Sequence, residues 1–330
     1  MSTDRPAPPV RAAQPADREA VLELLAASLG WVPDDLFDAF FSWKHDQNPA
    51  GRSPAWVALD DEGRPIGFRT FLRWRLVGTD GAPRLAVRAV DTATHPDHQG
   101  RGIFRLLTLH ALEELRDAGV DLVFNTPNDK SRPGYLTMGW TEVGTLAPHV
   151  RPASLAALVR MVRSKVPAER WSAPSDAGTT VAELLDGPGA HALLASLAPP
   201  AGLATERSVD HLRWRYGFGP LHYRATTLGA DPAEGAAIWR VRRRGAAREA
   251  ALCELLVPGG DGRARLALER AVARDAEADY VIRLGGPALD RAGFLRLPGQ
   301  GPVLVRRPLG RDEGATKADW DLGLGDVELF

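Results

Sequence analysis

The sequence predicts an α/β protein with mixed α+β sheets, built from two tandem copies of one unit. Three observations lead to this prediction. Strand-like and helix-like segments alternate along the first 140 residues, a glycine-rich turn joins a strand to a helix, and the second half weakly repeats the first. With 330 residues the chain is long enough for two domains, each with its own core.

The first copy has the predicted order β-α-β-β-β-α-β-α. A short strand from Val10 precedes an amphipathic helix whose apolar side carries Val21, Leu22, Leu24 and Leu25. Strands are expected at 55–61, 64–76, 85–95 and 120–126, a helix at about 102–118, and a short helix at 131–139. The central glycine turn therefore lies between an inner strand and its helix.

Three pairs of segments carry the repeat. WKHDQNP at 43–49 matches WRYGFGP at 214–220, and HPDHQGRG at 95–102 matches VPGGDGRA at 257–264. MGW at 138–140 has its counterpart in AGF at 292–294. Because the pairs occur in the same order, two copies of one unit explain the length better than two unrelated domains.

These signals give the expected domain boundaries. Residues 1–9 are polar, proline-rich and expected to be disordered. The first unit is expected at 10–150, a helical connection at 151–205, the second unit at 206–309 and a tail at 310–330. The connection contains a basic amphipathic helix at 154–166, which either lies on a membrane surface or, as we favour, exposes Arg160, Arg163 and Lys165 to solvent.

Composition excludes several classes of protein. A formal net charge of -1 leaves no basic excess for nucleic-acid binding. The lone cysteine, Cys253, allows no internal disulfide and is expected to be a small buried hydrophobic residue. No signal-peptide pattern, membrane span or spaced group of metal ligands is present, so we expect a cytoplasmic protein with no metal and no membrane partner.

The turn Gln99-Gly100-Arg101-Gly102 directly precedes an apolar helix. A helix N-terminus offers unpaired N–H groups and a partial positive charge, and glycines allow an anion to approach them. The alternative is a tight turn with no ligand. The dinucleotide fingerprint fails because Arg105 stands where its third glycine belongs, and the P-loop fails because no Gly-Lys-Ser/Thr follows.

The turn resembles the pyrophosphate loop of the GNAT superfamily of acyl-CoA-dependent N-acyltransferases, written Gln/Arg-x-x-Gly-x-Gly/Ala. Gln99, Gly102 and Ile103 match this pattern, while Phe104 departs from it. Downstream, Asn128, Tyr135 and Gly139-Trp140 resemble a second GNAT motif at the right spacing. The resemblance covers about residues 10–147, and residues 205–308 more faintly. The tandem layout is distantly similar to the acetyltransferases of the enhanced-intracellular-survival type.

The resemblance implies which residues hold acetyl-CoA or another short acyl-CoA. The loop would bind the pyrophosphate, the Thr92 N–H would face the thioester carbonyl, and Thr94 would pair with the pantetheine arm. Asn128 would bind a pantetheine amide or, alternatively, only cap the next helix. The set implied to bind the cosubstrate is Thr92, Ala93, Thr94, Gln99, Gly100, Arg101, Gly102, Ile103, Phe104, Asn128 and Ser131.

Two residues are candidates for proton transfer. The resemblance gives Tyr135 the role of general acid toward the CoA thiolate, with a packed core aromatic as the alternative. Asp91 is a candidate base because a carboxylate in an apolar strand is costly unless it is paired or functional. The alternative for Asp91 is a bond to Arg88 or to neighbouring backbone. His95 and His98 are read as turn residues.

The second copy is expected to be degenerate. Asp261 replaces Gln99, Ala264 replaces Gly102, and Leu289 stands where a tyrosine would be needed. A negative charge in the loop opposes a pyrophosphate. We therefore expect this copy to have a structural or substrate-shaping role and no transfer activity.

The predicted function is transfer of an acetyl group from acetyl-CoA to a primary amine of a small molecule, by a monomer or homodimer. Two alternatives stay open: a non-catalytic acyl-CoA sensor or scaffold, and a GNAT enzyme that acts on protein amines. One expectation for the acidic, apolar tail is that it folds back across the first copy, where Asp326, Glu328 or the Phe330 carboxylate would attract a cationic amine or accept its proton. The alternative is a tail that its apolar residues pin to the domain seam.

Overall fold

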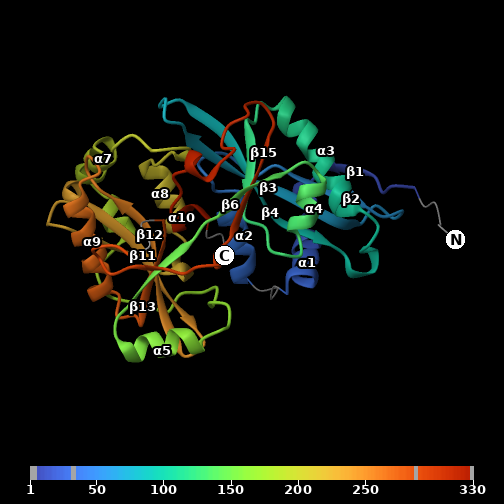
Figure 1. Ribbon diagram of the computed structural model, residues 1–330. Helices are drawn as coiled ribbons and strands as arrows, with labels where there is room; N and C mark the ends of the chain where they lie inside the picture. The colour runs from blue at the N-terminus through green and yellow to red at the C-terminus, as the bar shows by residue number, and fades with distance from the viewer. Residues whose placement is uncertain (1–5, 31–34, 286–288, 328–330) are drawn as a thin grey trace. The chain divides into compact units, whose positions relative to one another are not determined.

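The computed structural model describes residues 6–30, 35–285 and 289–327 (Figure 1). The expected disordered segment 1–9 therefore lies mostly outside the described residues. The chain divides into two compact units, which comprise residues 1–76, 83–143 and 304–315, and residues 77–82, 144–303 and 316–330. Each unit is built on a mixed sheet with helices, which confirms the predicted fold class.

The first unit contains a sheet of order β1-β2-β3-β4-β5-β15-β6. Strands β4 and β5 run parallel, while β5 and β15 run antiparallel. The strands are β1 (Val10–Ala12), β2 (Ala55–Leu59), β3 (Pro65–Val77), β4 (Pro83–Thr94), β5 (Leu122–Asn125), β6 (Thr141–Thr145) and β15 (Val303–Pro308). The helices are α1 (Arg18–Leu29), α2 (Asp35–His45), α3 (Ile103–Asp117) and α4 (Arg132–Thr137).

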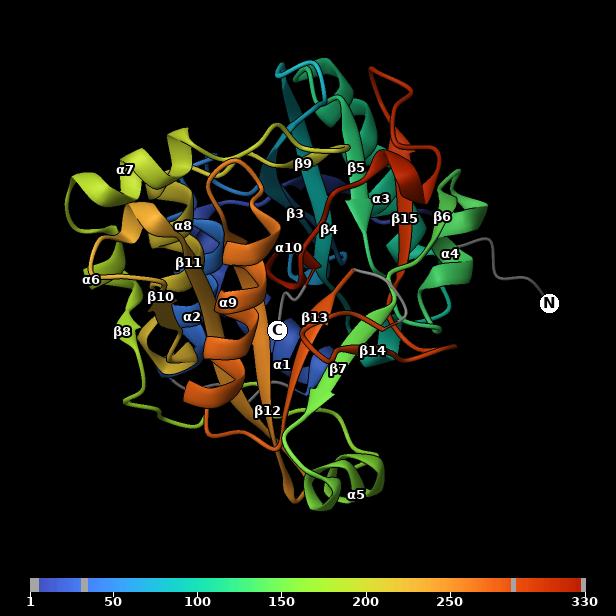
Figure 2. The same ribbon diagram turned by 60° about the vertical axis from the view of Figure 1, so that its left-hand side comes forward.

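The second unit contains a sheet of order β14-β7-β13-β12-β11-β10-β8. Its strands are β7 (Pro148–Pro152), β8 (Thr179–Thr180), β10 (Arg224–Thr227), β11 (Ala236–Arg244), β12 (Ala247–Leu256), β13 (Tyr280–Leu284) and β14 (Leu295–Arg296); β9 (Ala204–Thr205) is short. Its helices are α5 (Leu155–Arg163), α6 (Val181–Leu185), α7 (Pro188–Ala195), α8 (Val209–Tyr216), α9 (Gly262–Asp275) and α10 (Leu324–Val327). Helix α9 runs along one face of this sheet (Figure 2).

The units exchange strands, so the expected boundaries at 150 and 309 do not coincide with them. Strand β15 comes from the second copy but pairs with β5 in the first sheet. Strand β7 directly follows the first copy but pairs with β13 in the second sheet. Hydrophobic periodicity identifies a strand without identifying its partner, which is why the sequence placed both strands in the wrong unit.

Helix α2 was not expected from the sequence. It carries Phe37, Phe40 and Phe41 on the buried side, and Trp43, Lys44 and His45 at its C-terminal end are buried as well. Burial of consecutive residues at the end of a helix blurs the 3.6-residue pattern on which such a prediction depends. This helix end faces the site described below.

Helix α5 and the residues just after it expose Arg160, Arg163 and Lys165 to solvent, as we favoured for 154–166. The guanidinium of Arg160 also pairs with Asp279 of the same unit at 2.5 Å. The apolar side chains of Leu155 and Val162 are exposed as well, by 83% and 58%. No described helix is long and apolar enough to cross a membrane.

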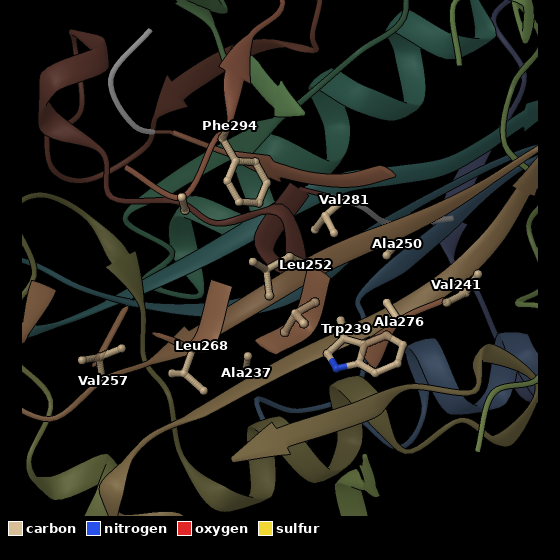
Figure 3. Close-up of a cluster of buried hydrophobic side chains, with 12 residues drawn as sticks. Ala237, Trp239, Val241, Ala250, Leu252, Val257, Leu268, Ala276, Val281 and Phe294 are labelled. Carbon is tan, nitrogen blue, oxygen red and sulfur yellow. The ribbon is translucent and has the colours of Figure 1, made fainter. Parts of the chain in front are cut away.

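The core of the second unit lies between its sheet and α9. Trp239 and Leu252 from the sheet pack with Leu268 from α9 and with Phe294 (Figure 3). Cys253 is buried beside this cluster, as expected from its apolar surroundings. The second unit thus has a hydrophobic core of its own.

In each sheet a central strand becomes irregular where its parallel pairing ends. In the first unit this irregularity lies at the candidate site described below. Parallel pairing of β4 with β5 ends at Arg88, and Asp91 three residues later has a φ of 39°. Parallel pairing of β12 with β13 ends at Ala251, and the register of β12 against β11 shifts between Leu252 and Glu254. In each unit a central strand therefore bulges where it parts from its parallel neighbour.

Candidate active site

The glycine turn has the geometry of an anion site. Gly100 and Gly102 have φ values of 74° and 75°, a conformation that L side chains rarely adopt. Gly102 is the N-cap of α3 and has no side chain with which to bind the first N–H groups of that helix. Residues 99–102 are exposed, and a Cβ added to either glycine would meet nothing within 4 Å. The helix N-terminus is thus open to a ligand.

The other loop residues divide between the surface and the core. Arg101 is exposed, with its Nη1 2.6 Å from His98 Nδ1, and Gln99 Nε2 lies 3.5 Å from the Thr94 carbonyl oxygen. Ile103 is buried against β3, where a Cβ on Gly67 would clash with it. Phe104 is half-buried. Residues 99–102 therefore form the exposed part of the loop, and Ile103 packs the start of the helix against the sheet.

In the second unit, a side chain already caps the N-terminus of the equivalent helix, α9. Asp261 is the N-cap of α9, and its side chain accepts a hydrogen bond from the Arg263 N–H at 2.8 Å. A carboxylate thus occupies the place that an anionic ligand would take. This geometry agrees with the expected loss of the loop in the second copy.

Tyr135 lies in α4, beside the N-terminal part of α3 (Figure 1). It is buried, with ring centroids 5.4 Å from Phe104 and 5.0 Å from Trp140. The guanidinium of Arg69 lies 5.4 Å from its ring and 5.5 Å from that of Phe104. The ring of Tyr135 is therefore packed like that of a core aromatic residue. A role as general acid would depend on its hydroxyl group alone.

Arg69 is a residue that the sequence did not single out. It is fully buried in β3, and its Nε and both Nη atoms have no hydrogen-bond partner among the described residues. Three aromatic rings, those of Phe71, Phe104 and Tyr135, surround its charge. Cation–π contacts therefore join the glycine loop to the candidate acid.

Asn128 caps the turn that leads into α4. Its Oδ1 accepts hydrogen bonds from the Lys130 N–H, the Ser131 N–H and the Ser131 hydroxyl, at 3.1, 2.9 and 3.0 Å. The side-chain oxygen of Asn128 thus caps the turn before α4, which was the alternative to binding a pantetheine amide. The Nδ2 group takes no part in these three bonds, and both Asn128 and its turn lie at the surface.

The end of β4 follows the bulge at Asp91. The Thr92 hydroxyl donates to the Phe68 carbonyl at 3.2 Å, and the Thr94 carbonyl accepts from the Ser28 hydroxyl at 2.9 Å. Ala93 is buried between them. Because β4 has already parted from β5 at Arg88, the strand edge from Thr92 to Thr94 lies beyond their parallel ladder.

Asp91 is held by the end of α2. Its Oδ2 lies 2.7 Å from Lys44 Nζ and 2.8 Å from His45 Nε2, and its side chain is 9% exposed. Asp91 is thus paired through Lys44 and His45, neither of which the sequence suggested as its partner. Burial alone raises the pKa of the Asp91 carboxyl, but the Lys44 charge and the His45 hydrogen bond outweigh burial and hold that pKa well below its usual range.

The described part of the tail is divided between the units, because residues 310–315 belong to the first unit and residues 316–327 to the second. Asp326 is buried, and its Oδ2 accepts from the Gly323 N–H at 2.6 Å and from Arg207 at 3.3 Å. Glu328 and Phe330 lie outside the described residues. No group of three or more metal-ligating side chains occurs among the residues that are described.

The part of the chain that carries this geometry matches a known family. The model of the acetyltransferase (GNAT) domain matches residues 9–143. Residues 9–143 are thus similar to GNAT acetyltransferase domains. The match includes the glycine loop, Asp91, Asn128 and Tyr135, and it covers the first copy but not the second.

Two curated relatives match part of this chain. A mycothiol acetyltransferase of Rhodococcus opacus (strain B4) is 34% identical over 117 residues, which are 32% of this chain and 35% of the relative. A mycothiol acetyltransferase of Rhodococcus jostii (strain RHA1) is 33% identical over 148 residues, covering 41% of this chain and 46% of the relative. The matched part thus spans less than half the length of these relatives.

Solved structures resemble nearly the whole chain in fold. Eis1 from Mycobacterium abscessus aligns with a TM-score of 0.58 and 17% identity, over 92% of this chain and 74% of that one. A GCN5-related N-acetyltransferase from Anabaena variabilis aligns with a TM-score of 0.64 and 12% identity, over 91% and 73%. At such identities the likeness concerns the fold alone.

Proposed function

We propose that the first unit is an acyl-CoA-dependent N-acyltransferase that moves an acetyl group from acetyl-CoA to a primary amine of a small molecule. The observation that carries the proposal is the bare N-terminus of α3, preceded by two glycines with positive φ inside the segment that is similar to GNAT acetyltransferase domains. The names of the curated relatives support acetyl as the transferred group.

In this proposal each part of the site has one task. The N–H groups of residues 99–104 and the Arg101 charge hold the pyrophosphate, for which the exposed loop leaves room. The free edge of β4, with Thr92, Ala93 and Thr94, binds the thioester and the pantetheine arm. Asn128 Nδ2 and the Ser131 turn border that arm.

Transfer joins the amine nitrogen to the acyl carbon, breaks the carbon–sulfur bond and releases CoA as a thiol. The amine loses a proton, and the leaving sulfur gains one. The Tyr135 hydroxyl supplies the proton to sulfur, while its ring is held by Phe104 and Trp140. We assign no transfer to the second unit, because the Asp261 carboxylate already caps α9.

The test is release of free CoA thiol from acetyl-CoA in the presence of a panel of small primary amines, with the acylated product identified by mass. We expect release that depends on the amine and is saturable in both substrates. Protein that binds CoA tightly but releases no thiol with any amine would instead be a sensor or scaffold. Acetylation of protein amines alone would assign the second alternative.

A further inference from the structure

One positive charge of the first unit is buried among aromatic rings. Arg69, in β3, is fully buried, and its Nε and both Nη atoms have no hydrogen-bond partner among the described residues. An isolated charge is costly to remove from water. A neutral side chain of similar size would fill the same space without this cost, so the charge itself indicates a task.

Three aromatic rings stand where polar partners of Arg69 would be expected. Its guanidinium carbon lies 4.5 Å from the ring centroid of Phe71, 5.5 Å from that of Phe104 and 5.4 Å from that of Tyr135. Phe104 and Tyr135 also meet edge to face, with their ring planes at 90°. Cation–π attraction offsets part of the cost of burial. Of these three rings, only that of Tyr135 carries a proton that it can lose.

The proposed transfer changes the charge of the Tyr135 ring. When the Tyr135 hydroxyl gives its proton to the leaving sulfur, the tyrosine becomes an anion whose charge spreads over the oxygen and the ring. The guanidinium of Arg69, 5.4 Å from the ring centroid, then faces an opposite charge in a buried place where water screens it little. The attraction is therefore stronger once the proton has moved than before, which is the condition for an interaction to speed the step.

We propose that Arg69 is a positioning residue for the transfer: it holds the Tyr135 ring and stabilises the anion that forms when Tyr135 protonates the leaving sulfur. The amine proton passes to solvent, the Tyr135 proton passes to sulfur, and the tyrosine anion regains a proton from solvent after CoA has left. Arg69 acts through Tyr135 and forms no bond to either substrate. This inference rests on the proposed function.

A double-mutant cycle in the full-length protein tests this role. Arg69→Met removes the charge and keeps an unbranched side chain, while Arg69→Lys keeps a positive charge. Arg69→Met is made both in the wild-type protein and in Tyr135→Phe. The value of kcat is measured by thiol release from acetyl-CoA with the most active amine of the panel described above, and CoA affinity is measured by calorimetry.

In the wild-type background we expect Arg69→Met to lower kcat by about 10- to 100-fold, because no cation then offsets the charge that forms on Tyr135. In the Tyr135→Phe background the ring cannot ionise, so the same substitution should lower kcat by less than about twofold. A purely structural role would instead lower kcat by the same factor in both backgrounds. Arg69→Lys should keep most of the wild-type kcat, and CoA affinity should be unchanged in every variant.

Arg88→Met is the matched control. Arg88 is also buried, with its guanidinium carbon 5.5 Å from the ring centroid of Trp74 and 5.1 Å from that of Phe124, and neither ring ionises in the transfer. Any effect of Arg88→Met on kcat should therefore be the same with and without the Tyr135 hydroxyl. Equal losses for Arg69→Met in both backgrounds, or wild-type kcat in folded Arg69→Met protein, would overturn the role of Arg69 and leave the proposed function standing. A wild-type protein that releases no thiol with any amine would overturn both.

Discussion

The hydroxyl of Tyr216 donates a hydrogen bond to the carboxylate of Glu254, with 2.6 Å between the two oxygens. In the first unit, His45 meets Asp91 in the same way at 2.8 Å. Tyr216 and His45 each stand two residues after the repeated tryptophan, at the end of α8 and of α2, and each carboxylate lies at or beside a strand bulge. The two units thus share a polar clamp between a helix end and the bulged central strand.

Asp91→Asn tests the clamp in the first unit. It leaves Lys44 buried without its carboxylate, so we expect a loss of about 3–5 kcal/mol in the free energy of unfolding, measured with denaturant at pH 7. Asp97→Asn, at an exposed carboxylate nearby, is the control and should change little. A loss no larger than that of the control would show that the clamp does not stabilise the unit.

The same variant has a pH signature. The folded-state pKa of Asp91 lies below the ordinary carboxyl value of about 3.9. This carboxylate therefore stabilises the fold fully above the ordinary value, and the stabilisation is lost progressively as the pH falls from that value through the lower folded-state pKa. The stability difference between wild type and Asp91→Asn should therefore shrink as the pH is lowered from about 5. A difference that stays constant down to pH 3 would contradict the depressed pKa.

Tyr135→Phe separates packing from proton transfer. The ring contacts with Phe104 and Trp140 are kept, so thermal stability and CoA affinity should stay at wild-type values. Turnover should fall by roughly 10- to 1,000-fold because the acid is lost. Wild-type turnover in this variant would leave Tyr135 with a packing role only.

Gly325→Ala tests how the C-terminal segment docks in the second unit. A Cβ at this position would fall on the Tyr216 hydroxyl and lie 3.1 Å from the Cys253 carbonyl oxygen. We expect a loss of about 1–3 kcal/mol from overpacking, measured by thermal unfolding. Gly219→Ala, whose Cβ would meet nothing within 4 Å, is the matched control. Equal melting temperatures would mean that the segment is not held there.

His211 gives the second unit a pH dependence of its own. Burial lowers its pKa to about 3, and Asp326, Arg207 and Arg215 are the charges that act on it. Between about pH 6.5 and pH 3 the unfolded chain binds a proton that the folded chain does not, so stability falls as the pH falls, by at most about 1.4 kcal/mol per pH unit. His211→Gln should flatten this slope, while His191→Gln, at an exposed histidine, should not. An unchanged slope in His211→Gln would contradict the lowered pKa.

The sequence predicted the local features of this protein better than its long-range pairings. The helix 103–117, its glycine start and the repeat of Trp43 and Trp214 follow from local patterns. The exchange of β7 and β15 does not, because strand partners are chosen by tertiary packing. The His45–Asp91 contact was not predicted because α2 was not expected. The repeated segments WKH and WRY nevertheless contain the two helix-end residues of the clamps, His45 and Tyr216.

The central claim, that the α3 N-terminus binds the CoA pyrophosphate, is tested most directly by calorimetric titration of CoA into two matched variants. Gly102→Asp and Gly63→Asp introduce the same charge at glycines with φ of 75° and 78°, and in both cases the new Cβ meets nothing within 4 Å. Both variants therefore carry the same backbone strain, but only Gly102 lies in the loop. We predict that CoA binding is abolished in Gly102→Asp and unchanged in Gly63→Asp. Wild-type affinity in folded Gly102→Asp would contradict the account.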